Sequence, residues 1–367
     1  MDQTYTCPLL RYGEQVLVLL QSVANCGGLD CSQYAASFAQ AFQDTNGGYR
    51  DVSTKGFLAN HFQGLQPPFT GAKDAQANCI VRCPPLVAGW AGNPGLFPAV
   101  QRATRVTQNS TVACIWACAA AAILEAVVLT GCSPSQAVAA VAAELQQVNE
   151  LRQSKQAPTA STEASQDAAL LEPESAALPE LQPAAAPITP GAAEHRARST
   201  SSQPVAEIAD RVHRFAFAGA MATQVSAHLS EAASLAALTP SSAVAQLGRN
   251  CHMPNALQTP LHIALHLEHR LREHLALSPA AWDASAAASL GHLYAAGVRL
   301  AISEGGCCAS RAAYLGALLG ASVGNKDGVI PRDWAVKYRQ YDAVFKHARM
   351  ICQTRFSAEA KDAAEGL

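Results

Sequence analysis

Apolar residues recur along this chain at the three- and four-residue spacing of an α-helix. The clearest case is the segment EQVLVLLQSVANC (14–26), whose apolar positions share one face and which ends at Gly27 and Gly28. The same pattern predicts helices at 31–44, 54–64, 111–131, 133–153, 207–238, 259–277, 285–306, 310–324 and 330–351. No segment shows the sustained two-residue alternation of a strand, and no heptad persists. The pattern therefore predicts an all-α fold, a compact orthogonal helical bundle.

The helical pattern is interrupted at residues 154–204, which are rich in Pro, Ala, Ser and Glu and show no apolar period. Such a segment cannot bury enough apolar surface to offset the entropy of ordering it. We therefore predict one helical domain in two parts, 1–153 and 205–353, separated by a disordered insertion at 154–204 and followed by a tail at 354–367.

Local signals refine this picture at three places. The stretch 67–95 is rich in Pro and Gly and predicts a long loop with a short apolar segment inside it. Ser32 and Ser133 are the predicted N-caps of their helices. The most apolar run, Thr111–Gly131, is as long as a membrane span, but it is mostly alanine and contains Glu125. A helix buried in a helical core is the favoured interpretation of this run.

Charge and cysteine content narrow the class of protein. The formal net charge is −2 and the basic residues are scattered, so the composition indicates neither a nucleic-acid nor a membrane partner. Twelve cysteines among 367 residues are too dilute for a disulfide scaffold, and the N-terminal segment has no signal-peptide core. We expect a cytoplasmic protein in a reducing compartment.

The segment SEGGCCASRAAYLGALLGASVGNKDGVIPRDW (303–334) carries the strongest motif. Two glycines open a helix of small residues, and an Ile-Pro pair and a Trp follow it. This order resembles the C-terminal motif of the ADP-ribosylglycohydrolase family. Three further segments agree with that family in order and spacing, namely YGEQVLVLLQSV (12–23), DAQANCIVRCPPLVAGWAG (74–92) and RVTQNSTVACIWACAAAAILEAVVLTG (105–131). The Gly-Gly-Cys helix start and the loop NCHMPNALQTPLH (250–262) resemble the J1-crystallin-like branch of the family.

The resemblance implies an all-α fold and Mg²⁺-dependent cleavage of an ADP-ribosyl glycosidic bond. Carboxylates and hydroxyls of two helix-opening turns hold the hard cations in that family. The resemblance matches the two aspartates of the last turn to Cys307 and Ala309, and its threonine to Ser310. It matches the acidic pair of the first turn to Gly13 and Glu14. The candidate metal ligands are therefore Glu14, Cys307 and Ser310, and a thiolate suits Zn²⁺ better than Mg²⁺.

The resemblance also implies roles for other residues. Glu14 is the candidate catalytic residue, and Gln108 stands where the family has a histidine. The candidate binding residues for ADP-ribose or a related nucleotide sugar are Asp74, Asn78, Arg82, Gln108, Gly305 and Gly306. The family has a further helix upstream of the first acidic turn, and this sequence begins eleven residues before Tyr12, so we expect that helix to be missing.

Each of these residues also has a purely structural explanation. Glu14 in a first helical turn favours the helix dipole, and Ser310 is a good N-cap. Cys307 and Cys308 can be ordinary buried cysteines, and Asp74 can cap a loop.

The substitutions at the ligand positions predict a degenerate or altered hydrolase activity. The first alternative is an active metal-dependent hydrolase that uses Glu14, Cys307 and Ser310. The second is a non-enzymatic structural or zinc-binding interaction protein. The zinc ligands in this second alternative are His262, His266 and His269, which share one face of the predicted helix.

Overall fold

The structure is a computed structural model that describes residues 11–43, 50–156, 214–278, 281–323, 329–338 and 340–354. Within these ranges the chain is helical, and the only β-type pairings there are two isolated bridges, Ala72 with Gln108 and Gln76 with His252. The helices are α1 (Arg11–Cys26), α2 (Cys31–Phe42), α3 (Val52–Phe62), α4 (Asn78–Val81), α5 (Cys83–Trp90), α6 (Leu96–Thr107), α7 (Thr111–Thr130), α8 (Pro134–Gln156), the 3-10 turn η1 (Ala216–Ala218), α10 (Met221–Ser234), α11 (Pro240–Leu247), α12 (Asn255–His274), α13 (Ala284–His292), α14 (Tyr294–Ser303), α15 (Cys308–Val323), α16 (Arg332–Lys337) and α17 (Tyr341–Thr354). The predicted all-α fold is confirmed.

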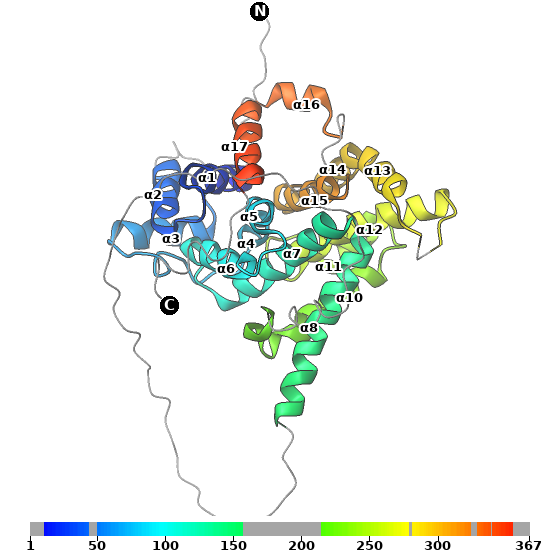
Figure 1. Cartoon of the computed structure of the whole chain (residues 1–367), viewed down its shortest axis with the longest axis horizontal. Coiled ribbons are helices and arrows are strands. Elements are labelled where there is room, and N and C mark those ends of the chain that lie inside the picture. The colour runs from blue at the N-terminus through cyan, green and yellow to red at the C-terminus, as the bar shows by residue number, and fades with distance from the viewer. Residues whose placement is uncertain are drawn as a thin grey trace, which may run out of the picture.

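Helix α7 forms the centre of the bundle (Figure 1). Its first turn is capped by Ser110, whose hydroxyl accepts a hydrogen bond from the Ala113 amide, and it ends at Gly131 in the left-handed conformation, with φ of 65°. It is long and apolar enough to cross a membrane, yet 78% of its most apolar window is buried inside the protein. Alanine lets α4, α5, α6, α8 and α15 pack closely around it. The predicted core helix is confirmed.

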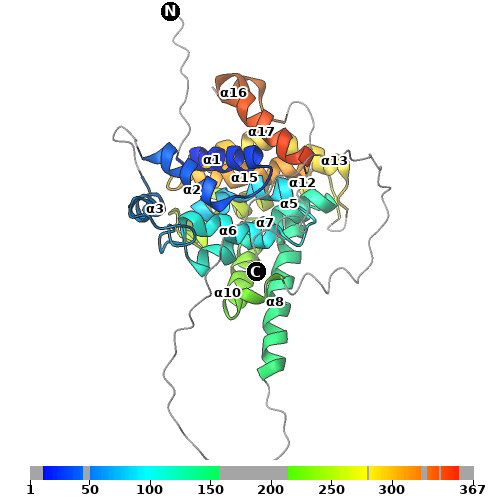
Figure 2. The same ribbon diagram turned by 60° about the vertical axis from the view of Figure 1, so that its left-hand side comes forward.

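Two pairs of helices mark the opposite ends of the molecule (Figures 1 and 2). Helices α16 and α17 lie at one end of the molecule, where α17 packs on α1 and α5, and α8 and α10 pack together at the opposite end. Arg214 precedes α10 and is paired with Glu125 of α7 at 2.5 Å and with Glu144 of α8 at 2.9 Å. This ion-pair network joins the second part of the domain to the first.

Several local predictions were wrong. Residues 78–90 of the predicted loop form α4 and α5. Pro84 and Pro85 lie in the first turn of α5, where a backbone N–H would have no partner within the helix, so proline is tolerated there. The N-cap of α2 is Asp30 rather than Ser32, since the Asp30 carboxylate accepts from the Gln33 amide at 2.9 Å. The Ser133 cap is confirmed by the bond from the Gln136 amide at 3.3 Å.

Three predicted helices are each divided. In the described part of the segment 207–238, the 3-10 turn η1 ends at Gly219, which has a positive φ, and α10 begins only at Met221. The segment 285–306 is broken between α13 and α14, and the segment 330–351 between α16 and α17. The predicted disordered insertion lies outside the described residues except for 154–156, which end α8. The tail beyond residue 354 and the N-terminal residues 1–10, where the earlier family helix is expected to be missing, also lie outside them.

Candidate functional site

A buried carboxylate, Asp51, lies where the starts of α1, α3 and α4 meet. As the N-cap of α3 it accepts at Oδ1 from the Thr54 amide and the Ser53 hydroxyl, both at 2.8 Å. Its Oδ2 accepts from the Gln15 side-chain amide at 2.8 Å and from that of Asn78 at 3.0 Å. Burial raises the pKa of Asp51, but these hydrogen bonds outweigh it and hold the pKa below its ordinary value. Asp51 is therefore an ionised carboxylate surrounded by donors.

Asp51 connects to a chain of hydrogen bonds through Asn78 on α4. Residue Arg82 lies one helical turn further on and donates from Nε to the Asn78 carbonyl at 2.8 Å. Its guanidinium also donates to Gln108 Oε1 at 2.7 Å, and Gln108 Nε2 donates to Asp74 Oδ2 at 3.1 Å. The structure thus brings together all four of these predicted binding residues.

We call the connected set of Gln15, Asp51, Asp74, Asn78, Arg82 and Gln108 the acid–amide network. All of its members except the half-buried Asp74 are buried. Burial raises the pKa of Asp74, and the nearby charge of Asp51 raises it further. Arg82 stabilises the network from within, because its guanidinium also bonds the hydroxyls of Tyr34 and Thr107. The network is rigid, since most of its donors and acceptors are already used.

A second group of side chains, the thiol cluster, consists of Tyr12, Cys251, Cys307 and Ser310. The Cys307 sulfur lies 3.5 Å from the Tyr12 hydroxyl and 2.9 Å from the Ser310 hydroxyl. Cys251 also contacts the Tyr12 hydroxyl and lies close enough to Cys307 for their charges to interact. Burial raises the pKa of Tyr12 well above its ordinary value, and Cys307 adds to the rise, so the phenol stays protonated.

Gly305 and Gly306 shape the turn that carries Cys307. Both adopt positive φ, 68° and 63°. A Cβ on Gly306 would lie 2.1 Å from the Arg249 carbonyl oxygen, so only glycine allows this approach. Arg311, 1% exposed, donates to the Gly305 carbonyl at 2.9 Å and fixes the turn from behind. A binding role for the two glycines stays a prediction.

Glu14 lies in the first turn of α1. It is half-buried and lies near Tyr338, whose pKa is raised by burial and further by the Glu14 charge. The adjacent Gln15 enters the acid–amide network instead. Positions 12 and 15 share a helical face because they are three residues apart, whereas position 14 is rotated away from position 15 by about 100°. The grouping of Glu14 with Cys307 and Ser310 stays a prediction.

The histidine face of α12 has carbonyl and carboxylate partners of its own. His262 Nε2 lies 3.0 Å from the Leu235 carbonyl, His266 Nδ1 lies 3.0 Å from the Ala236 carbonyl, and His269 is paired with Glu273 at 3.3 Å. Among the described residues, no three His, Cys, Asp or Glu side chains are grouped closely enough to hold a metal ion. The zinc alternative therefore lacks a ligand set in this part of the chain.

A pocket of about 260 Å³ adjoins the network at Ala75, the neighbour of Asp74. Helices α7 and α10 and the loop before α12 line it, with Ala75, Val112, Trp116, Met221, Gln224, His228, His252, Met253 and Pro254. The rings of Trp116 and His228 are tilted by 43° relative to each other, with their centroids 6.1 Å apart. The pocket is apolar, with a few polar groups and two kinds of aromatic ring, which is the usual lining of a small-molecule site.

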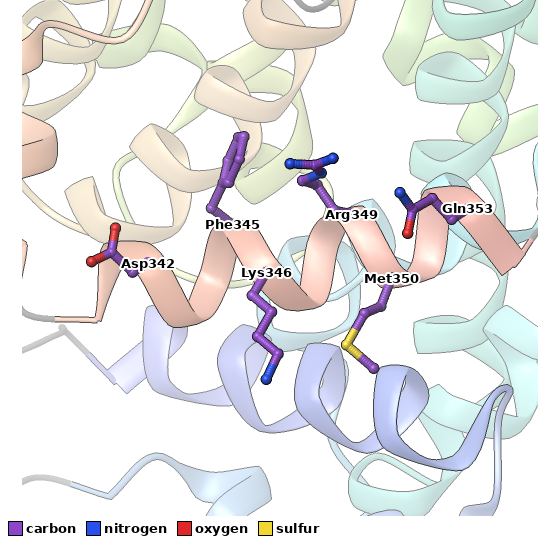
Figure 3. Close-up of a pocket in the computed structure, with 6 residues that line it drawn as sticks. All are labelled: Asp342, Phe345, Lys346, Arg349, Met350 and Gln353. Carbon is purple, nitrogen blue, oxygen red and sulfur yellow. The ribbon is translucent and has the colours of Figure 1, made fainter.

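A second hollow, of about 360 Å³, lies along α17 and is lined by that helix alone. Lys346 and Met350 point toward α1 in Figure 3, whereas Phe345 and Arg349 lie on the other side of the helix. None of the predicted site residues lines this hollow.

Sequence reasoning missed four residues of the site, namely Tyr12, Gln15, Asp51 and Cys251. Asp51 begins the segment Asp-Val-Ser-Thr, which signals a helix N-cap and nothing more. Gln15 could have been found from the helical period, because it lies on the buried face of α1 with Leu19. Cys251 has no local signal, since only the tertiary fold brings it to Cys307.

Comparisons with known proteins agree with this architecture. The family model described as ADP-ribosylglycohydrolase matches residues 11–193. A solved structure described as an ADP-ribosylglycohydrolase-related protein complex is similar with a TM-score of 0.50 and 15% sequence identity, over 95% of this chain and 82% of that one. At that identity the likeness concerns the fold alone. No curated protein matches the sequence. The family match, the shared fold and the four ordered motifs together show that this chain belongs to the ADP-ribosylglycohydrolase family.

Proposed function

We propose that this protein binds ADP-ribose or a related nucleotide sugar and lacks the Mg²⁺-dependent hydrolysis expected of its family. The observation that carries the proposal is the bonding of Asp51. Both of its oxygens already accept two hydrogen bonds, and the two donors at Oδ2 are side-chain amides of Gln15 and Asn78. Amide protons therefore occupy the carboxylate surface that a cation would need.

The remaining side chains do not fit magnesium either. Mg²⁺ requires oxygen ligands in near-octahedral geometry, and carboxylates are its usual protein ligands. At the Gly-Gly turn the resemblance matches the family's first aspartate to Cys307, a soft sulfur ligand, and Ser310 donates to the Cys307 carbonyl at 3.1 Å. We derive no catalytic step through a metal. The same Gly-Gly-Cys turn supports placing the chain in the J1-crystallin-like branch, as part of this proposal.

The pocket beside Ala75 supports retained binding. Its volume of about 260 Å³ accommodates one ring system, and Trp116 and His228 offer aromatic faces for stacking. The half-buried Asp74 lies next to the pocket and can accept a hydrogen bond from a ribose hydroxyl. The rest of such a ligand would extend from the pocket toward the acid–amide network.

Calorimetric titration of the purified protein with ADP-ribose, with and without Mg²⁺, tests this proposal. We expect binding whose Kd does not change with Mg²⁺, and no release of ADP-ribose from an ADP-ribosylated substrate. Substitution His228→Ala removes a pocket wall and should weaken binding about tenfold, or ~1.4 kcal/mol. His269→Ala is a matched control, because both side chains are 38% exposed and both pair with a glutamate at 3.3 Å.

Three results would contradict the proposal. Mg²⁺-dependent turnover that Glu14→Gln abolishes would favour the active-hydrolase alternative. If the well-folded protein does not bind ADP-ribose, the result would favour a purely structural role for the protein. An equal loss of affinity in both histidine variants would place the ligand elsewhere.

A further inference from the structure

Two half-buried cysteines from distant parts of the sequence meet at the candidate site. Cys251 lies in the loop before α12, and Cys307 immediately precedes α15. Both are thiols in the structure, and both contact the Tyr12 hydroxyl. Their separation in sequence means that only tertiary contacts place them together.

Backbone contacts hold the two segments against each other. The Cys307 amide donates to the Arg249 carbonyl at 2.7 Å, and Gly306 packs directly on that carbonyl. On the other side of the loop, the Ala77 amide donates to the Cys251 carbonyl at 2.8 Å. The two sulfurs therefore lie in segments whose positions are fixed without any covalent bond between them.

Other cysteines of this protein have a different environment. Cys79, Cys83, Cys114 and Cys118 are fully buried in the core around α7, and the thiols of Cys83, Cys114 and Cys118 lie against backbone carbonyls. Burial raises the pKa of each of these thiols, which makes them poor nucleophiles. Solvent access distinguishes the half-buried pair from this buried set, whereas the pKa does not, because burial raises the pKa of Cys251 as well. Peroxide should therefore reach the half-buried pair first.

We propose that Cys251 and Cys307 form a redox-responsive pair, which hydrogen peroxide converts to a disulfide across the candidate site. In the first step the Cys307 thiolate attacks one peroxide oxygen, the O–O bond breaks, and a sulfenic acid and water form after protonation of the leaving hydroxide. The Cys251 sulfur then attacks the sulfenic sulfur, the S–O bond breaks, and a second water leaves. Two thiols are oxidised and one peroxide is reduced to two waters.

Cys307 is assigned the first step because two hydroxyls surround its sulfur. Tyr12 lies 3.5 Å away and can donate to the thiolate, and Ser310, 2.9 Å away, can do so when its hydroxyl turns from the Cys307 carbonyl to the sulfur. Cys251 is left as the resolving thiol.

The disulfide would also bear on ligand binding. The residues that follow Cys251, His252 to Pro254, line the pocket beside Ala75, so a bond from Cys251 to α15 would fix that wall of the pocket. This consequence rests on the proposed function, whereas formation of the disulfide does not.

Peptide mapping after peroxide treatment tests the proposal. Trypsin should release Cys251 within residues 250–270 and Cys307 together with Cys308 within residues 300–311. In the wild type we expect these two peptides to appear joined, with the loss of two hydrogens, at peroxide concentrations that leave the core cysteines reduced. The joined species should persist in Cys308→Ser and disappear in Cys251→Ser and in Cys307→Ser. Cys308 is a matched control because it is adjacent to Cys307 and equally half-buried.

The outcomes separate the proposal from its alternatives. A joined species that Cys308→Ser removes, or peptides that remain unjoined while the core cysteines oxidise, would overturn it. Circular dichroism of each variant before oxidation checks folding, and a variant that fails to fold is replaced by the alanine substitution. The proposed function is tested separately by titrating reduced and oxidised wild type with ADP-ribose, because disulfide formation without any binding would refute only the proposed function.

Discussion

The acid–amide network and the thiol cluster occupy neighbouring parts of one site, yet their chemistry differs completely. In the network, Asp51 is 4% exposed and has four donors on its two oxygens. In the cluster, Cys307 and Cys251 are only half-buried and lie against hydroxyls that can rotate. The two halves meet at the first turn of α1, where Gln15 belongs to the network and Tyr12 to the cluster.

Under the proposed function, this difference illustrates two ways in which a site can lack a metal centre. In the network a carboxylate remains, and amide N–H groups satisfy it, so that its role becomes structural. In the cluster the carboxylates are absent, and the side chains present are a soft nucleophile and two hydroxyl donors. The first half therefore contributes mainly to stability and the second mainly to reactivity. Each of the predictions below tests one side of this division.

The largest effect is expected for Arg82→Met in the network. The substitution leaves the acceptors of Gln108, Tyr34 and the Asn78 carbonyl buried without their donor, and should lower the free energy of unfolding by about 3 kcal/mol. Urea denaturation followed by circular dichroism measures this loss. Arg105→Met is the control, because Arg105 is half-buried and bonds only a side chain one turn away, Asn109, and should cost less than about 1 kcal/mol. Equal losses would show that the network has no special role in stability.

Asp51→Asn should cost about 2 kcal/mol at neutral pH, because a charged acceptor of four hydrogen bonds is replaced by a neutral group with two N–H donors. The folded protein lowers the pKa of Asp51, so its ionisation stabilises the fold above the unfolded pKa of about 4. That contribution is lost as the pH falls through the folded-state pKa. Thermal unfolding curves of wild type and variant should therefore converge on acidification. Asp30→Asn, at an exposed N-cap, should differ little from wild type, since asparagine caps as well as aspartate.

Much of the fold could be predicted from the sequence because helix signals are local. Helix α7 follows from an apolar run that starts after Ser110 and ends at Gly131, and both residues cap it in the structure. The break at Leu293 between α13 and α14 could not be predicted, because the apolar spacing continues across it. Likewise, Pro84 and Pro85 signalled a loop although they begin α5. Proline is tolerated in the first turn of a helix, so this pair marks the beginning of α5 rather than a loop.

The site was predictable only where a resemblance supplied long-range information. Asp74, Asn78, Arg82 and Gln108 come together as one hydrogen-bonded chain, although nothing local in the sequence connects position 78 with position 108. The helical period alone would have favoured Gln15 over Glu14, since Gln15 lies on the apolar face of α1. Cys251 required the three-dimensional structure, because the contact between its loop and the Gly-Gly turn has no counterpart in sequence spacing.

Restoring oxygen ligands should move the site toward a metal centre. We expect the double variant Gln15→Asp with Cys307→Asp to gain stability in Mg²⁺, by about 1.4 kcal/mol when Mg²⁺ exceeds its Kd tenfold, whereas the wild type gains none. Differential scanning fluorimetry with and without Mg²⁺ measures the shift, and Ca²⁺ provides a comparison for size selectivity. A shift of the same size in the wild type would mean that Asp51 binds a cation despite its four hydrogen bonds.

The smallest effect on stability and the clearest effect on reactivity are expected for Tyr12→Phe. The phenol is half-buried and its oxygen contacts sulfur, so removing it should change the free energy of unfolding by less than about 1 kcal/mol. Formation of the disulfide between Cys251 and Cys307 in peroxide should nevertheless slow several-fold, because the thiolate loses one of its two hydroxyl donors. Tyr338→Phe is the control, since that phenol lies near Glu14 and away from the thiols. If Tyr12→Phe instead lowered stability as much as Arg82→Met and left the oxidation rate unchanged, the thiol cluster would be a structural contact, and the division between the two halves of the site would not hold.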